Sequence, residues 1–156
     1  MARPEATRGR AAAGRRRARG AGPDLSTRVG SVELAAPVLT ASGTAGHGAE
    51  LASSVDLARL GAVVVKSLSA DPWPGNPAPR VHPTPAGMIN SVGLQGPGVA
   101  RWLAEDLPPL LATGARVVAS IWGRTVDDYA RAAAALAQAP DGVVAVEVNV
   151  SCPNLE

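Results

Sequence analysis

Residues 143–154 have the sequence Val-Val-Ala-Val-Glu-Val-Asn-Val-Ser-Cys-Pro-Asn. The part from Val143 to Val148 is apolar enough to predict a buried strand, and it gives way abruptly to polar side chains and a proline. Parallel α/β proteins place their reactive groups at strand ends of this kind. Cys152, the only cysteine in the chain, is therefore either a thiol presented to a ligand or a small residue packed under a loop.

The composition indicates a globular α/β protein. Hydrophobic residues make up 46% of the chain and charged residues 18%, and no run approaches the roughly 18 apolar residues of a membrane span. The 17 glycines and 14 prolines suit many short turns between strands and helices. A single cysteine argues against a disulfide scaffold and for a reducing compartment. We therefore expect a cytoplasmic protein without membrane association.

The charge of the chain is divided between two regions. Residues 1–24 hold seven arginines against two acidic residues, a balance of +5, and the whole chain carries +2, which leaves −3 for residues 25–156. The first region, rich in Ala, Gly and Arg, predicts a disordered basic extension. Such an arm could bind nucleic acid or direct targeting. Because it has neither aromatic residues nor an apolar segment, we favour a solvated extension and expect no nucleic-acid partner.

Strand and helix patterns alternate along residues 25–156. Gly30-Ser31 predicts a small hairpin between residues 27–29 and 32–34. The expected strands of the main sheet are at residues 37–40, 62–65, 116–121 and 143–148. The expected helices are at residues 49–60, at 99–111 with Pro108-Pro109 breaking or kinking it, and at 125–139 with a capping box at Thr125–Asp128.

Residues 71–98 are expected to form a long loop, because five prolines lie between Pro72 and Pro83 and forbid a helix. Loops of this length in compact domains are usually functional. The overall order of elements calls for a parallel sheet, either open and doubly wound or closed into a βα-barrel.

Polar or glycine residues stand at the carboxyl end of each predicted strand of the main sheet. They are Ser42 and Gly43, Lys66 and Ser67, Ser120, and Asn149 with Cys152. The carboxyl ends of all strands meet at one face of a barrel, where catalytic groups gather. Lys66 is the only lysine, a compact ammonium where every other cation is a guanidinium, so we interpret it as functional. Four βα units out of eight predict an incomplete (β/α)8 TIM barrel, about half of one.

From about residue 25 onward, five motifs resemble the N-terminal half of class 1 dihydroorotate dehydrogenases, the FMN-containing enzymes of pyrimidine synthesis. The motifs are Ala41-Ser42-Gly43-Thr44, Lys66-Ser67, Pro74-Gly75-Asn76-Pro77 with Pro79-Arg80, Asn90-Ser91-Val92-Gly93-Leu94-Gln95, and Asn149-Val150-Ser151-Cys152-Pro153-Asn154. The pattern Gly-Leu-Gln-x-Pro-Gly at residues 93–98 is most similar to the NAD-linked subtype, which works with an FAD and iron–sulfur subunit.

The resemblance implies oxidation of dihydroorotate to orotate with hydride transfer to FMN, Cys152 acting as the base and Lys66 as the second catalytic residue. The implied substrate contacts are Lys66, Asn90, Gly93, Leu94, Asn149 and Asn154. The implied flavin contacts are Ala41, Ser42, Gly43, Lys66, Ser67, Ser120 and Asn149. The resemblance implies no metal site, and it implies a homodimer for a full-length protein.

Two further expectations qualify this assignment. Dihydropyrimidine dehydrogenases have a related barrel and a similar cysteine loop, but they tend to carry His at the position of Asn154, which favours dihydroorotate here. Ala45 departs from the aromatic residue that is frequent after Ser-Gly-Thr, which affects loop packing and not chemistry. Because phosphate usually binds after strands seven and eight of such barrels, we expect residues 1–156 alone to bind FMN weakly or not at all and to be inactive.

Overall fold

The computed structural model describes residues 23–152, so the predicted basic extension at residues 1–24 lies almost wholly outside the described residues. The main sheet contains β3 (Val63–Val64), β6 (Val117–Ile121) and β7 (Val143–Val148), in the order β3-β6-β7. Both pairings are parallel. The strands expected at residues 62–65, 116–121 and 143–148 and the parallel sheet are therefore confirmed, but the predicted burial of residues 143–148 is wrong, since no residue of β7 is buried and its last three are exposed.

The strand expected at residues 37–40 is not formed as a regular strand, although the segment lies where it was predicted, beside β3. Leu39 pairs with Ala62 in an isolated parallel bridge. The side chain of Thr40 accepts a hydrogen bond from Val64 N at 2.8 Å and donates one to Val64 O at 3.1 Å. The Thr40 hydroxyl thus replaces backbone groups in the hydrogen bonds to Val64. The segment therefore stays paired with β3 although it does not have regular strand geometry.

The single helix expected at residues 49–60 is wrong. Two short 3₁₀ turns take its place, η1 (Glu50–Ser53) and η2 (Leu57–Arg59). Asp56 caps η2 with its carboxylate, which accepts a hydrogen bond from Ala58 N at 3.2 Å. Serine and aspartate side chains compete for backbone groups in this way, which explains why the apolar spacing does not produce one continuous helix.

The helix expected at residues 99–111 forms in three consecutive parts, α1 (Val99–Arg101), the π-helical η3 (Trp102–Asp106) and α2 (Leu107–Ala112). Pro108 and Pro109 lie in the first turn of α2 and have no N–H to donate to the preceding turn. The wider π turn directly before them accommodates the missing donors. The prolines thus disturb the helix, as predicted, without ending it.

The capping box predicted at Thr125 and Asp128 is confirmed. Thr125 Oγ1 accepts from Asp128 N at 3.2 Å, and Asp128 Oδ2 accepts from Thr125 N at 3.0 Å. This box opens α3 (Val126–Leu136), which ends three residues before the predicted end. Acidic residues in the first turn also suit the positive end of the helix dipole.

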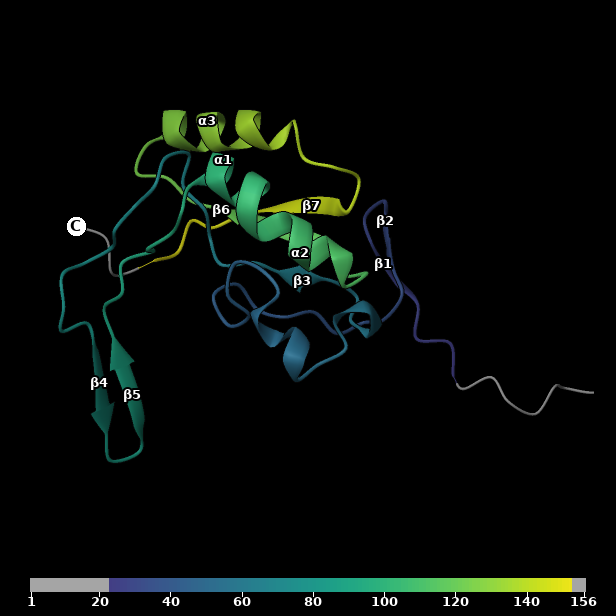
Figure 1. Cartoon of the computed structure of the whole chain (residues 1–156), viewed down its shortest axis with the longest axis horizontal. Coiled ribbons are helices and arrows are strands. Elements are labelled where there is room, and N and C mark those ends of the chain that lie inside the picture. The colour runs from purple at the N-terminus through teal and green to yellow at the C-terminus, as the bar shows by residue number, and fades with distance from the viewer. Residues whose placement is uncertain (1–22, 153–156) are drawn as a thin grey trace, which may run out of the picture.

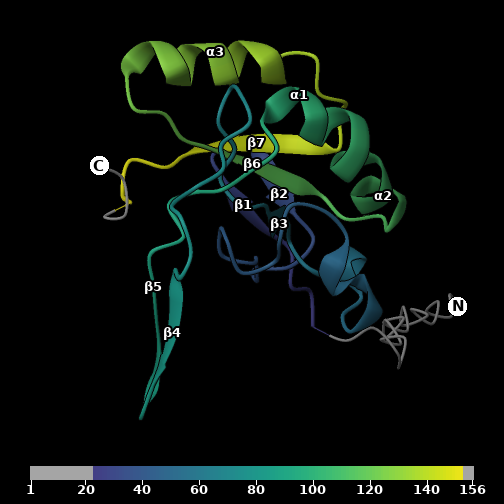
Figure 2. The same ribbon diagram turned by 60° about the vertical axis from the view of Figure 1, so that its left-hand side comes forward.

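Two hairpins lie outside the main sheet. The predicted one is confirmed as β1 (Thr27–Val29) with β2 (Val32–Leu34), joined through Gly30 at φ 58°. The other, β4 (Val81–Thr84) with β5 (Gly87–Asn90), lies within the segment expected to be a loop. It projects away from the sheet in both views (Figures 1 and 2). All of its strand residues are exposed, so the sequence lacks the pattern of apolar residues that would have predicted these strands.

The helices α1, α2 and α3 lie over one face of the main sheet (Figures 1 and 2). The core between them is formed by alternate residues of β3 and β6 and by helix residues, among them Val63, Val117, Ala119, Ile121, Trp102, Leu107, Leu110 and Leu136. Since strand side chains alternate, Ser120 points to the opposite face. No helix among residues 23–152 is long and apolar enough to cross a membrane.

Candidate functional site

Three serines from separate strand ends meet in one hydrogen-bonded cluster. Ser67 Oγ and Ser120 Oγ are 2.8 Å apart, and Ser42 Oγ lies 3.1 Å from Ser67 Oγ and 3.3 Å from Ser120 Oγ. Ser67 follows β3, Ser120 is the penultimate residue of β6, and Ser42 follows the segment that pairs with β3. The structure therefore brings together three of the predicted flavin contacts.

Two residues from β7 and its end extend the cluster. Asn149 Nδ2 donates to Ser67 Oγ at 2.9 Å, and Ser120 Oγ donates to Glu147 Oε1 at 2.7 Å. Asn149 is a predicted site residue, whereas Glu147 was not predicted. The signal for Glu147 was available in the sequence, because a single carboxylate interrupts an otherwise apolar strand of six residues.

Two serines of the cluster are buried, while Ser42 and Asn149 are half-buried and Glu147 is exposed. Ser67 is 1% exposed and Ser120 is fully buried. A buried hydroxyl without a partner costs about 1–3 kcal/mol, so burial of this kind requires every hydroxyl to be paired. Each of the three serines is paired with another member of the cluster, which makes the arrangement specific.

The loop at residues 41–48 brings open backbone to this cluster. Gly43 has φ 81°, and a side chain built there would meet nothing within 4 Å. Thr44 closes the turn, since both its N–H and its hydroxyl donate to Ala41 O, at 3.1 and 2.7 Å. Gly43 thus presents main-chain atoms beside Ser42 without a side chain, and Ala41 adds only a methyl group.

Lys66 lies between this loop and the cluster. Its backbone N–H donates to Gly46 O at 2.9 Å, and its side chain is half-buried. Burial lowers the pKa of His47, and the positive charge of Lys66 lowers it further. The ammonium group of Lys66 therefore acts on His47, which lies in the same loop as Ser42.

The strand end that leads to Cys152 is held on both sides. Tyr129 Oη donates to Asn149 O at 2.6 Å, and Ser151 N donates to Asn149 Oδ1 at 3.0 Å. Cys152 is half-buried and follows this turn. Asn154, predicted to contact substrate, lies outside the described residues.

The remaining predicted residues lie at the base of the β4–β5 hairpin. Asn90 ends β5 and is exposed, while Gly93 and Leu94 follow it with φ values of 71° and 53°. Trp73 Nε1 donates to Gly93 O at 3.0 Å, and Asn76 N donates to Val92 O at 3.0 Å. The Pro-Gly-Asn-Pro motif thus packs against the Asn90 motif.

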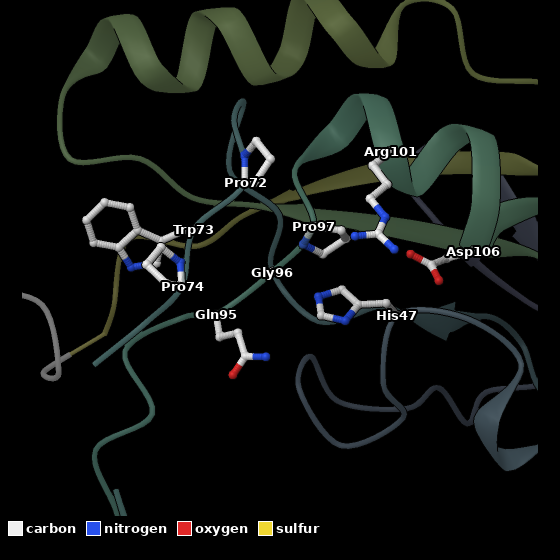
Figure 3. Close-up of a pocket in the computed structure, with 9 residues that line it drawn as sticks. All are labelled: His47, Pro72, Trp73, Pro74, Gln95, Gly96, Pro97, Arg101 and Asp106. Atoms are coloured by element: carbon white, nitrogen blue, oxygen red, sulfur yellow. The ribbon is translucent and has the colours of Figure 1, made fainter. Parts of the chain in front are cut away.

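A hollow of about 490 Å³ opens beside His47, in the loop at residues 41–48. Its lining residues are His47, Pro72, Trp73, Pro74, Gln95, Gly96, Pro97, Arg101 and Asp106. His47, Arg101 and Asp106 lie on one side and Trp73 with Pro74 on the other (Figure 3). It contains no member of the serine cluster. No group of three His, Cys, Asp or Glu side chains within residues 23–152 could hold a metal ion.

The fold and cluster define a parallel α/β protein with a polar site at the carboxyl ends of its strands. Residues 24–156 match the dihydroorotate dehydrogenase family, and the chain belongs to that family. The match covers nearly all of the chain after the basic extension, which confirms the resemblance seen in the five sequence motifs.

Curated relatives of this family are similar over the same region. The chain is 52% identical over 128 residues to the "Dihydroorotate dehydrogenase B (NAD(+)), catalytic subunit" of Desulforudis audaxviator, a match that covers 82% of this chain and 41% of the relative. It is 43% identical over 134 residues to the subunit of the same name from Geotalea uraniireducens, covering 86% of this chain and 44% of the relative. The chain therefore spans less than half the length of these relatives.

The fold also resembles a solved structure, the crystal structure of Eimeria tenella DHODH in complex with ferulenol. The TM-score is 0.60 at 21% sequence identity, and the match covers 86% of this chain and 39% of that one. At this identity the likeness shows the fold alone. It agrees with the mixed α/β architecture of the described residues.

Proposed function

We propose that residues 25–156 form the first half of a (β/α)8 barrel that oxidises dihydroorotate to orotate with FMN as its cofactor, and that residues 1–24 are a separate extension. The observation that carries the proposal is the hydrogen-bonded cluster that joins Ser42, Ser67, Ser120 and Asn149 across strand ends. In a chain of the dihydroorotate dehydrogenase family, this is where a barrel keeps its active site.

The exposed face of β7 supports the half-barrel. Ile121 on β6 pairs with Val148 on β7, and Ala119 pairs with Val146, so these valines share the face that the helices cover elsewhere. Val146 is nevertheless 46% exposed and Val148 57% exposed. Apolar strand residues on the helix side call for a further helix over β7, as the next βα unit of a barrel would supply.

The donor set of the site suits a flavin. An isoalloxazine ring is planar and needs hydrogen-bond partners along its polar edge, which the side chain of Ser42 and the second amide hydrogen of Asn149 offer, while Ser67 holds both from behind. The open backbone at Gly43 allows a flat ring to approach closely. Ala41, Lys66 and Ser120 complete the proposed contacts. When bound, FMN would accept the hydride that leaves carbon C6 of the substrate.

We assign Cys152 as the base that takes the proton from C5 of dihydroorotate as the C5–C6 double bond forms. A thiolate can act in this way if its loop limits access of water, and Cys152 is half-buried. The bonds from Tyr129 and Ser151 to Asn149 hold the strand end that carries the loop. A fixed loop keeps the sulfur within reach of one carbon atom.

We assign substrate binding to the cation and the amides around the cluster. The ammonium of Lys66 would pair with the substrate carboxylate and offset developing negative charge. Asn90, Asn149 and Asn154 each offer a donor and an acceptor, which suits the cyclic amide groups of dihydroorotate. Backbone groups at Gly93 and Leu94 would border the same ring.

The names of the relatives support an NAD-linked enzyme with more than one subunit. We propose that electrons leave through a partner subunit that carries FAD and an iron–sulfur cluster, and that the barrel forms a cytoplasmic homodimer.

A chimaera tests the proposal. Residues 24–156 would replace the matching part of the Desulforudis audaxviator subunit, which supplies the second half of the barrel. The chimaera should bind FMN, and dihydroorotate should bleach the flavin absorption under anaerobic conditions. A folded chimaera whose bound flavin stays oxidised would contradict the proposed activity. Residues 1–156 alone should bind FMN weakly or not at all, and a yellow, active monomer of this chain would contradict the half-barrel.

A further inference from the structure

The serine cluster has a direction that its chemistry fixes. An ionised carboxylate has no hydrogen to donate, so in the 2.7 Å bond between Ser120 and Glu147 the hydroxyl must donate. Ser120 has a single hydrogen, which this bond uses. In its 2.8 Å contact with Ser67, Ser120 can therefore only accept, and Ser67 must donate.

The same reasoning determines the rest of the cluster. Ser67 gives its hydrogen to Ser120, so it can only accept from Asn149 at 2.9 Å and from Ser42 at 3.1 Å. The hydrogen of Ser42 therefore points toward its serine neighbours. Ser42 is left with lone pairs alone on its open side, next to Gly43.

The far end of the cluster is fixed independently. The backbone N–H of Ser151 can only donate, so the side-chain atom of Asn149 that lies 3.0 Å from it must be the oxygen. The amide nitrogen of Asn149 then faces Ser67 and donates to it. A donor at one end and a carboxylate at the other impose the same direction on every bond between them.

The bonds that run from Asn149 and Ser42 through Ser67 and Ser120 to Glu147 form a hydrogen-bond relay. We propose that Glu147 is a positioning residue that sets the direction of this relay and leaves Ser42 to act only as an acceptor toward a bound ligand. Glu147 acts through Ser120 and touches neither Ser42 nor Ser67 in the relay. The consequence for flavin binding rests on the proposed function, whereas the direction of the relay does not.

Substitutions of Glu147 separate the acceptor from the charge. In the chimaera, Glu147→Leu removes the acceptor, and the affinity for FMN, measured by quenching of flavin fluorescence, should fall about tenfold. Glu147→Gln keeps a carbonyl acceptor for Ser120, and its affinity should stay within about threefold of the parent. Because Glu147 acts through Ser120, Glu147→Leu should have no further effect in a Ser120→Ala background.

A reversal experiment tests the direction itself without a flavin. Asn149→Asp replaces the donor with a second carboxylate, so one contact along the relay loses its hydrogen, and the melting temperature should fall by about 5 °C. Adding Glu147→Gln lets the whole relay run the other way, since the glutamine amide can donate to Ser120. The double variant should regain at least half of the lost melting temperature, whereas Glu147→Leu with Asn149→Asp should not.

The outcomes are distinct for the two claims. Additive effects of Glu147→Gln and Asn149→Asp, or a loss in Glu147→Gln as large as in Glu147→Leu, would overturn the relay. Recovery of the melting temperature in a chimaera that dihydroorotate cannot reduce would support the relay and count against the proposed function alone.

Discussion

The hydroxyl of Tyr129, on α3, donates a 2.6 Å hydrogen bond to the backbone oxygen of Asn149, directly after β7. This bond crosses from the helix layer to the strand end that carries the cysteine loop. Tyr129 is the only tyrosine in the chain. The helix therefore positions the site through a side chain that takes no part in the serine cluster.

Removing this hydroxyl should affect stability and the site together. Tyr129→Phe in the chimaera should lower the free energy of unfolding by about 1 kcal/mol, the usual net value of one such bond. It should also slow flavin reduction, because the Cys152 loop loses a support. Urea unfolding and rapid-mixing absorbance measure the two effects. Val126→Ala, at a position 87% exposed on the same helix, should change neither; equal effects in both variants would count against the role of Tyr129.

The capping box predicts an acid-dependent contribution to stability. Hydrogen bonds from Arg131 and Thr125 lower the pKa of Asp128 from 3.8 to about 2. A carboxyl group with a lowered folded-state pKa stabilises the fold above its unfolded pKa, and this contribution is lost as the pH falls from about 4 toward 2.

Between pH 6 and pH 2, the free energy of unfolding should therefore fall more steeply in the parent chimaera than in the Asp128→Asn variant. The variant should be less stable at pH 6, and the two curves should converge near pH 2. Asp141→Asn removes an exposed aspartate from the turn before β7 and serves as the control for loss of one charge. Parallel curves for the parent and Asp128→Asn would refute the assigned role.

Gly61 is needed for close packing of the first parallel segment on β3. A side-chain carbon added at Gly61 would lie 2.2 Å from the backbone oxygen of Ala36, whereas one added at Gly87 would meet nothing within 4 Å. Gly61→Ala should destabilise the chimaera by about 2 kcal/mol and weaken FMN binding, because the shifted segment leads to Ser42. Gly87→Ala should stay within about 0.5 kcal/mol of the parent. Equal stability of the two variants would show that the segment moves freely.

The sequence predicted those parts of the fold that buried periodicity determines. The runs that became β6 and β7 are apolar except for Ser120 and Glu147, and the capping residues of α3 stand beside their helix, so local patterns suffice. The segment at residues 49–60 has helical apolar spacing, yet the cap formed by Asp56 divides it into two turns. The spacing of apolar residues does not indicate whether a polar side chain, such as that of Asp56, will form a hydrogen bond with the backbone and interrupt the helix.

The site was predictable only where strand ends carry polar groups. Ser42, Ser67, Ser120 and Asn149 were chosen because each lies at or just after the carboxyl end of a predicted strand, and parallel strands bring such positions together. Glu147 was missed because it lies inside a strand, and only the register of β6 with β7 places it opposite Ser120. The β4–β5 hairpin was missed because both of its strands are fully exposed, so their sequence does not alternate between apolar buried and polar exposed residues.

The central claim is that Cys152 removes a proton from dihydroorotate beside a flavin. The most direct measurement is rapid-mixing reduction of FMN by dihydroorotate in the chimaera and in its Cys152→Ala variant, with FMN and orotate affinities measured alongside. We expect both affinities to stay largely intact and the reduction rate to fall by orders of magnitude, since general-base catalysis contributes about 10²–10⁴-fold. An unchanged reduction rate in Cys152→Ala would contradict the account.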